Sequence, residues 1–243
     1  MILFEVGMLN WPEAAGPIGY IHSPFDELFG IPRQSGLAAA AQGYLEPIAP
    51  WDDPAAWQGI EAFSHLWLIW QFHAKAPMQA GKSKQVRPPR LGGNQRVGVF
   101  ASRAPIRPNP IGLSLVRLEG VQYHQTGGAK RVKLKLSGLD LRDGTPVLDV
   151  KPYIPYADCP ADSEAGWAAQ PPERMPVVFA AALEQHPALD EAFKALIVQT
   201  LSLNPTPAYH QDTERRYGVC LQGWDVQFYC RADCIEVTGL VQP

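Results

Sequence analysis

The chain has 243 residues, 46% of them hydrophobic and 19% charged, and its formal net charge is −3 at pH 7. This length is enough to bury a core in one or two domains, and no apolar run is long enough to cross a bilayer, which excludes a membrane-spanning class. The small negative charge excludes a protein coated with positive charge, and the N-terminal sequence shows no secretory signal, so we expect a cytoplasmic protein.

Short strands predominate in residues 17–155. Strict alternation at residues 131–137 and runs rich in branched or aromatic side chains at residues 66–73, 96–101 and 111–118 are typical of strands. Turn-prone residues at 125–128 and 142–145 separate them, and no long amphipathic helix intervenes. The pattern predicts a mainly β fold, a closed or nearly closed barrel and not a doubly wound Rossmann sheet.

One part of this predicted barrel is strongly basic. No Asp or Glu occurs between Glu61 and Glu119, whereas nine lysines and arginines do: Lys75, Lys82, Lys84, Arg87, Arg90, Arg96, Arg103, Arg107 and Arg117. We therefore expect an anionic partner there. The alternative is an ordinary solvated surface whose counter-charges come from distant parts of the chain.

The run VGVFASRAPIRPNPIGLSL at residues 97–115 contains a stiff loop. Three prolines fix the backbone and remove donors, so the loop holds its arginines at little entropic cost on binding. Two more proline-containing turns, at residues 30–34 and 86–93, present further arginines, and residues 139–146 supply carboxylates on a turn with glycine. The alternative is a proline-rich barrel corner with solvated arginines.

The C-terminal third differs in pattern. We expect a barrel domain at 1–157, a Pro- and Ala-rich linker at 158–175 and a small α+β domain at 176–243. The last of these has expected strands at 177–183, 217–221, 226–230 and 235–241 and a helix at 187–201. The four cysteines, Cys159, Cys220, Cys230 and Cys234, form no CxxC pair, so reduced, packed thiols and no metal site are expected.

Five ordered blocks resemble the TsaA-like (TrmO) family. They are GIPRQ (30–34), GIEAFSHLWLIWQFH (59–73), RPPRLGGN (87–94), VGVFASRAPIRPNPIGLSLV (97–116) and LDLRDGTPVLDVKPYIPYAD (139–158). The resemblance implies a single-sheeted β-barrel that binds S-adenosylmethionine without a Rossmann domain, a homodimer, and a smaller C-terminal domain. It also implies methylation of N6 of threonylcarbamoyladenosine at position 37 of tRNA.

The family's cofactor pocket is carried over onto matching positions of this sequence. The implied set is Pro32, Arg33, Gln34, His73, Arg103, Leu113, Asp140, Asp143, Gly144 and Thr145. The chain departs from the family at Ala74, where a polar residue is common, and at residues 204–209, which read NPTPAY in place of DPRPAY because of Asn204 and Thr206. The first dozen residues extend beyond the usual start.

The implied acceptor is a poor nucleophile because its lone pair is delocalised into the purine and the carbamoyl group, so a base for the N6 proton would help. Asp140, Asp143 and His73 are the unranked candidates. We assign Arg107 to the substrate's threonine carboxylate and Arg87, Arg90, Asn109 and Tyr209 to RNA contacts. Two alternatives remain, a methyltransferase with another acceptor and a non-catalytic RNA-binding module.

Overall fold

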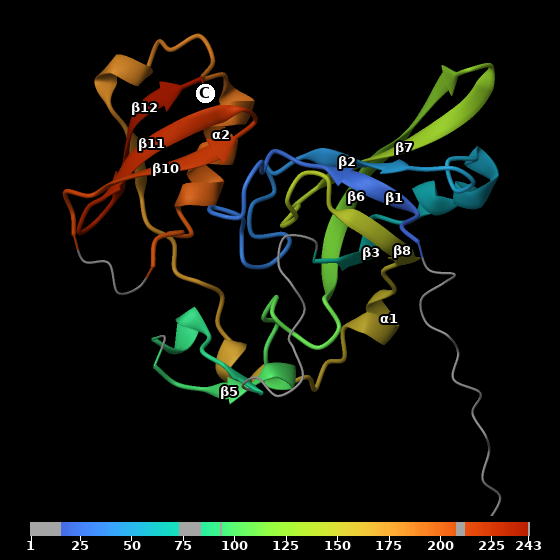
Figure 1. Cartoon of the computed structure of the whole chain (residues 1–243), viewed down its shortest axis with the longest axis horizontal. Helices are drawn as coiled ribbons and strands as arrows, with labels where there is room; N and C mark the ends of the chain where they lie inside the picture. The colour runs from blue at the N-terminus through green and yellow to red at the C-terminus, as the bar shows by residue number, and fades with distance from the viewer. Residues whose placement is uncertain (1–15, 73–83, 93, 208–211, 243) are drawn as a thin grey trace, which may run out of the picture.

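The computed structural model describes residues 16–72, 84–92, 94–207 and 212–242. Two β bodies lie side by side, with a loop-rich arm below them (Figure 1). The first body contains six of the strands between residues 19 and 152, and the second contains the strands and the helix of residues 177–241. The prediction of a mainly β fold is confirmed.

The first body is one antiparallel sheet of six strands. These are β1 (Gly19–His22), β2 (Gly43–Pro47), β3 (His65–Gln71), β6 (Ile111–Thr126), β7 (Ala129–Ser137) and β8 (Pro146–Pro152). They pair in the closed order β1-β2-β7-β6-β3-β8. The ladder that closes the barrel is short, with Gly19 opposite Val147 and Tyr20 opposite Pro146.

Alternation along the strands fills the barrel. Val132, Leu134 and Leu136 of β7 are at most 1% exposed, as the sequence pattern predicts. Leu66 and Leu68 of β3 are equally buried and belong to the same core. Each such side chain contributes about 1.5–3 kcal/mol by leaving water, so the register of these strands is strongly specified.

The hairpin of β6 and β7 is longer than the sequence predicts. The strand expected at 111–118 continues through a register shift between Leu118 and Gly120 as far as Thr126. Gly127 and Gly128, both with positive φ, make the two-residue turn into β7. The hairpin end projects beyond the barrel at the upper right of Figure 1.

Residues 84–92 and 94–110, which we call the basic arm, connect β3 to β6. The arm holds the two-residue strands β4 (Gln85–Val86) and β5 (Val97–Gly98) and the 3₁₀ helices η3 (Pro89–Leu91) and η4 (Val99–Ala101). The prediction of a strand at 96–101 is therefore wrong beyond Gly98, where the 3₁₀ helix η4 begins. The two-residue pairing of β4 with β5 leaves this run outside the barrel, where no ladder extends it.

The second body is a four-stranded sheet with a helix. Its strands β9 (Val177–Phe179), β10 (Arg216–Leu221), β11 (Trp224–Cys230) and β12 (Ile235–Val241) have the order β10-β11-β12-β9. The helix α2 (Glu191–Leu201) starts four residues later than predicted because Asp190 caps it, accepting a hydrogen bond from the Phe193 amide. The strand expected at 177–183 ends at Phe179, before η6 (Ala181–Leu183).

The segment between the two bodies is exposed but attached to its neighbours. It includes α1 (Pro155–Asp158) and η5 (Gly166–Ala168). The Trp167 indole donates to the Ala101 carbonyl at 3.2 Å, and Arg90 donates to the Gln170 carbonyl, so the segment lies against the basic arm. The exact domain boundaries stay a prediction.

Two further findings concern features outside the sheets. Within the residues that the structure describes, no helix is both long and apolar enough to span a bilayer. All four cysteines are free thiols, and Cys159 is exposed, so the expectation of packed thiols is wrong for this residue.

One glycine of β6 controls how the barrel wall packs. Gly112 lies opposite Trp70, and a Cβ added there would overlap the indole ring. We predict that Gly112→Ala lowers the free energy of unfolding by about 1–3 kcal/mol, because the displaced indole strains the core. Gly98→Ala is the control, since an added Cβ meets nothing within 4 Å there. Equal denaturation midpoints for the two variants would contradict the prediction.

Candidate active site around Asp140

Residues 33–36 lie alongside β6 and the loop that follows β7. The amide of Leu115 in β6 donates to Ser35 Oγ at 3.0 Å, and the amide of Gly36 donates to the Gly138 carbonyl at 2.9 Å. Residues that are far apart in sequence are thereby fixed side by side. The Pro-stiffened turn predicted to present Arg33 and Gln34 is therefore next to the loop that carries Asp140.

Asp140 is the centre of this arrangement. The Trp70 indole donates to Ser114 Oγ at 3.0 Å, and the Ser114 hydroxyl donates to Asp140 Oδ1 at 2.6 Å. Burial raises the pKa of the Asp140 carboxyl to about 6, although the bonds from Ser114 and the Ser35 backbone and the charge of Arg103 act in the opposite direction. A carboxyl in this state can accept or release a proton near neutral pH.

Two polar side chains from different segments meet within electrostatic range of this carboxyl. The Arg103 guanidinium donates to the Gln34 side-chain oxygen, and the Arg103 charge acts on Asp140. The structure thus brings together Gln34, Arg103 and Asp140. Their types suit a ligand that carries both hydrogen-bond donors and a negatively charged group.

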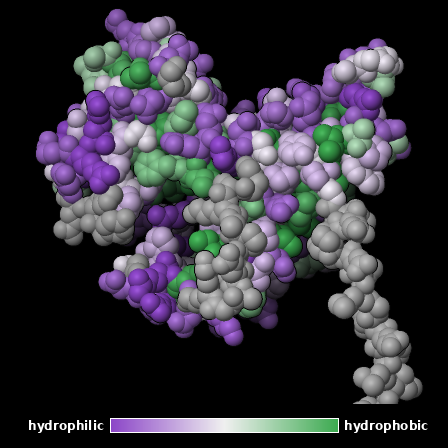
Figure 2. All heavy atoms as spheres, in the orientation of Figure 1, coloured by the Kyte–Doolittle hydropathy of each residue, from purple (hydrophilic) through white to green (hydrophobic). Residues whose placement is uncertain are grey.

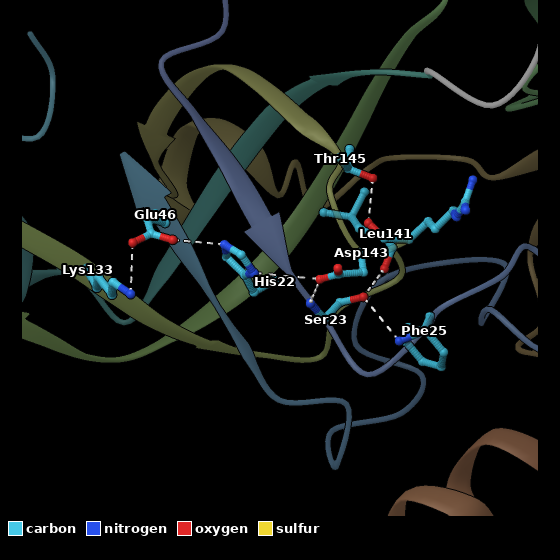
Figure 3. Close-up of polar contacts among 9 residues, drawn as sticks. His22, Ser23, Phe25, Glu46, Lys133, Leu141, Asp143 and Thr145 are labelled. Carbon is cyan, nitrogen blue, oxygen red and sulfur yellow. Dashed lines mark hydrogen bonds and ion pairs between the residues drawn. The ribbon is translucent and has the colours of Figure 1, made fainter. Parts of the chain in front are cut away.

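Asp143 belongs to a different network, shown in Figure 3. Its carboxylate accepts a hydrogen bond from the Ser23 amide at 3.0 Å and lies 3.8 Å from His22 Nδ1. His22 in turn contacts Glu46, which also pairs with Lys133 at 2.8 Å. Asp143 therefore holds the chain that leaves β1, and the geometry favours Asp140 over Asp143 for chemistry.

Gly144 and Thr145 also hold the loop in place. The Gly144 amide donates to the Ile21 carbonyl at 2.8 Å, and Gly144 has a φ of 74°. Thr145 is 1% exposed, and its hydroxyl donates to the Arg142 carbonyl at 2.6 Å. Any contact of these two residues with a cofactor stays a prediction.

The basic arm keeps most of its charge. Among the described residues, none of the arm's cations Lys84, Arg87, Arg90, Arg96, Arg103 and Arg107 forms an ion pair. Partial burial and the nearby charge of Arg90 lower the pKa of Arg33. Figure 2 shows mainly hydrophilic atoms on the visible face of the arm, at the lower left. This unneutralised charge favours an anionic partner over a surface balanced by distant acids.

Arg107 has a structural contact as well. Its Nη1 donates to the carbonyls of Ser102 and Ala104 at 3.1 and 3.3 Å, which braces the proline-rich loop. Arg90 is engaged with the Gln170 carbonyl. Arg87 and Asn109 are exposed. Their assignments to RNA stay predictions.

The other expected site residues have different surroundings. Pro32 is buried, and Leu113 is 52% exposed on β6. His73 and Tyr209 lie outside the described residues, as do the first fifteen residues of the chain. The family departures Asn204 and Thr206 form a local turn, in which Asn204 has a φ of 45° and its side-chain oxygen accepts the Thr206 hydroxyl at 2.6 Å.

Sequence reasoning missed Ser35, Ser114 and Trp70. A signal for Ser114 was present, because it occupies an inward position of the apolar run at 111–116 and a buried hydroxyl needs a partner. Ser35 directly follows the expected Arg33 and Gln34. The bond between Trp70 and Ser114 depends on strand register, which a local pattern does not give.

A hollow of about 440 Å³ lies in the basic arm and not around Asp140. Its lining is Gln85, Val86, Arg87, Arg96, Ala104, Pro105 and Ile106. Because Ala104 directly follows Arg103 in the chain, the hollow and the Asp140 site share one loop. The arrangement offers a desolvated acid on one side and a basic, partly apolar surface on the other.

Two family models match the chain. The tRNA-methyltransferase O N-terminal domain matches residues 20–159, and the TrmO C-terminal domain matches residues 172–243. Together they include both bodies of the fold.

Individual proteins are similar over nearly the whole chain. The Escherichia coli tRNA (adenine(37)-N6)-methyltransferase is 45% identical, over 92% of this chain and 95% of its own length. A Pseudomonas aeruginosa protein, RcsF, whose name provisionally assigns it as an S-adenosylmethionine-dependent methyltransferase, is 47% identical over 92% and 96%. The crystal structure of TrmO from Pseudomonas aeruginosa superposes with a TM-score of 0.74 at 42% identity and covers 95% of this chain and 98% of that one.

The raised pKa of Asp140 has a consequence for stability. The folded protein holds this proton up to about pH 6, whereas an unfolded carboxyl releases it near pH 4, so the group's contribution to stability falls as the pH rises through this interval. Asp140→Asn removes this pH-dependent loss of stability, because an amide side chain does not ionise. We predict that the variant's free energy of unfolding, relative to that of the unmodified protein, rises by on the order of 1–2 kcal/mol between about pH 4.5 and about pH 7.5.

The control for this prediction is Asp143→Asn, because the Asp143 side chain is 45% exposed. Urea unfolding at both pH values provides the measurement. The prediction is wrong if Asp140→Asn loses stability relative to the unmodified protein as the pH rises.

Proposed function

The chain belongs to the tRNA-methyltransferase O family, and on that premise we propose that it methylates N6 of the threonylcarbamoyladenosine at position 37 of tRNA, with S-adenosylmethionine as donor. It is a methyltransferase that acts on tRNA. The proposal rests on one observation above all, the desolvated Asp140 carboxyl held between Ser114 and Ser35 beside an unneutralised basic arm.

The residues around Asp140 fit such a donor. When bound, S-adenosylmethionine supplies a methyl group from its sulfonium. Arg103 can pair with the carboxylate of the donor's methionine part, and Gln34 offers an amide beside it. The hydrogen bond from the Leu115 amide of β6 to Ser35 Oγ holds the residue next to Gln34 before binding, which keeps the ordering cost low.

Asp140 is our choice among the three candidate bases. A carboxylate with a pKa of about 6 is mostly ionised at neutral pH and more basic than an ordinary one, so it can accept the N6 proton as the N6–methyl bond forms and the sulfur–methyl bond breaks. The proton then passes from Asp140 to water. Ser114 and Trp70 keep Oδ1 in place for this step.

The basic arm suits the polyanionic substrate. We assign Arg87 and Arg90 to phosphates and Arg107 to the threonine carboxylate, since a guanidinium pairs with either group through two hydrogen bonds. Arg33, which lies within electrostatic range of Arg90, adds a further positive charge to the same surface.

We also propose that the protein is a cytoplasmic homodimer. Four large apolar side chains on or beside the arm are exposed to solvent: Phe100 at 79%, Leu113 at 52%, Ile106 at 45% and Ile111 at 39%. A second copy of the chain would cover such side chains.

The reaction is tested by the nucleosides of tRNA from cells that lack this protein. We expect threonylcarbamoyladenosine to lose one methyl group, detected by mass spectrometry, and to regain it when the protein is restored. Unchanged methylation would overturn the proposed substrate. Loss of a methyl group from another nucleoside would move the activity to a different acceptor.

The Arg107 assignment is tested by Arg107→Gln. We predict that kcat/KM on tRNA bearing the threonylcarbamoyl group falls by about tenfold or more, because the carboxylate loses its bidentate partner. Binding of unmodified tRNA should fall much less. Arg96→Gln removes the same charge from the same arm and serves as the control.

Equal losses on modified and unmodified tRNA would reject the assignment. They would mean that Arg107 acts only by bracing the loop through Ser102 and Ala104.

A further inference from the structure

Residues 23–42, which we call the crossover segment, connect β1 to β2 and contain the Arg33 and Gln34 turn. The segment begins at the edge of the second body. Phe25 forms an isolated β-bridge with Leu221, and the Gln222 amide donates to the Pro24 carbonyl at 2.9 Å. The Asp26 carboxylate accepts a hydrogen bond from the Gly223 amide at 3.0 Å. The Glu27 carboxylate accepts one from the Cys220 amide at 3.1 Å. Four contacts therefore fix this end on the β10–β11 turn.

The middle of the crossover segment also packs on β10. Gly30 has a φ of 89°, and an added Cβ would overlap the Val219 side chain. Val219 is fully buried. This close approach fixes the chain two residues before Pro32.

The other end of the crossover segment is held by helix α2. The amide of Ala40 donates to the Gln199 side-chain oxygen at 2.8 Å. Arg174 donates to the Leu37 carbonyl and, at 2.9 Å, to Ser202 Oγ at the end of the helix. The second body, together with Arg174 just before it, therefore contacts the crossover segment on both sides of residues 33–36.

We propose that the second body acts as a clamp, which holds the turn of Arg33 and Gln34 in the conformation that binds the donor. In this proposal Gln199 and Arg174 are positioning residues for donor binding. The inference rests on the proposed function, because it takes Gln34, on this turn, as a donor ligand. Without the clamp, residues 33–41 sample other conformations, and the apparent dissociation constant rises in proportion to the fraction that is no longer competent. By linkage, donor binding strengthens the contact between the two bodies to the same extent.

The test compares Gln199→Ala with Gln199→Glu. The alanine variant loses the acceptor for Ala40, whereas glutamate keeps an oxygen for the amide and lies near Arg174, whose Nη1 already approaches the Gln199 carbonyl. Calorimetry should give a dissociation constant for S-adenosylmethionine about three- to tenfold higher for Gln199→Ala and close to normal for Gln199→Glu. Gln185→Ala, at an exposed position of the same body, should be unchanged.

Hydrogen exchange of the full chain gives a second readout that needs no donor. Amides of residues 33–41 should exchange faster in Gln199→Ala than in Gln199→Glu. At saturating donor, kcat should be nearly equal in both. Normal donor affinity and normal exchange in Gln199→Ala would overturn the clamp.

Two outcomes separate the inference from its premise. If the unmodified protein binds no S-adenosylmethionine, the proposed function fails, and exchange of residues 33–41 alone decides whether the clamp exists. If Gln199→Ala does not fold, Arg174→Ala carries the test, because this exposed residue contributes the contacts to Leu37, Ser202 and the Gln199 main-chain carbonyl.

Discussion

Burying a carboxyl away from water costs free energy unless hydrogen-bond donors compensate for the lost hydration. The candidate site depends on the donors that this chain supplies to Asp140. The Asp140 carboxyl accepts hydrogen bonds from the Ser114 hydroxyl and the Ser35 backbone. Ser114 is itself held by a hydrogen bond from the Trp70 indole. These four residues come from β3, β6 and the two loops beside β6. The barrel therefore orients the acid, and the acid in turn fixes the place of the crossover segment.

The clamp extends this dependence to the second body. The crossover segment contacts β10 at one end and α2 at the other, and buried side chains of both bodies form one continuous hydrophobic cluster. The connecting segment adds contacts to the basic arm through Trp167 and Gln170. In this account the C-terminal body contributes to donor binding without touching the donor.

The local sequence pattern correctly predicted the features that local residue order determines, namely strand faces and tight turns. Alternation in residues 131–137 gave the buried face of β7, and the glycines at 127–128 gave its turn. The run at 96–101 has the same apolar character, yet it forms a 3₁₀ helix because only two of its residues find a pairing partner. The resemblance selected Asp140 and Asp143 together, and only the three-dimensional contacts separate them, since Ser114 reaches Asp140 from β6 and Ser23 reaches Asp143 from the segment after β1.

A crystal structure with bound S-adenosylhomocysteine, the demethylated product of the donor, tests the central claim most directly. The account predicts that this ligand contacts Gln34 and Arg103 beside the Asp140 carboxyl. Density for the ligand in the hollow between Arg87 and Ile106, or next to Asp143 and His22, with the Asp140 surroundings unchanged, would contradict it.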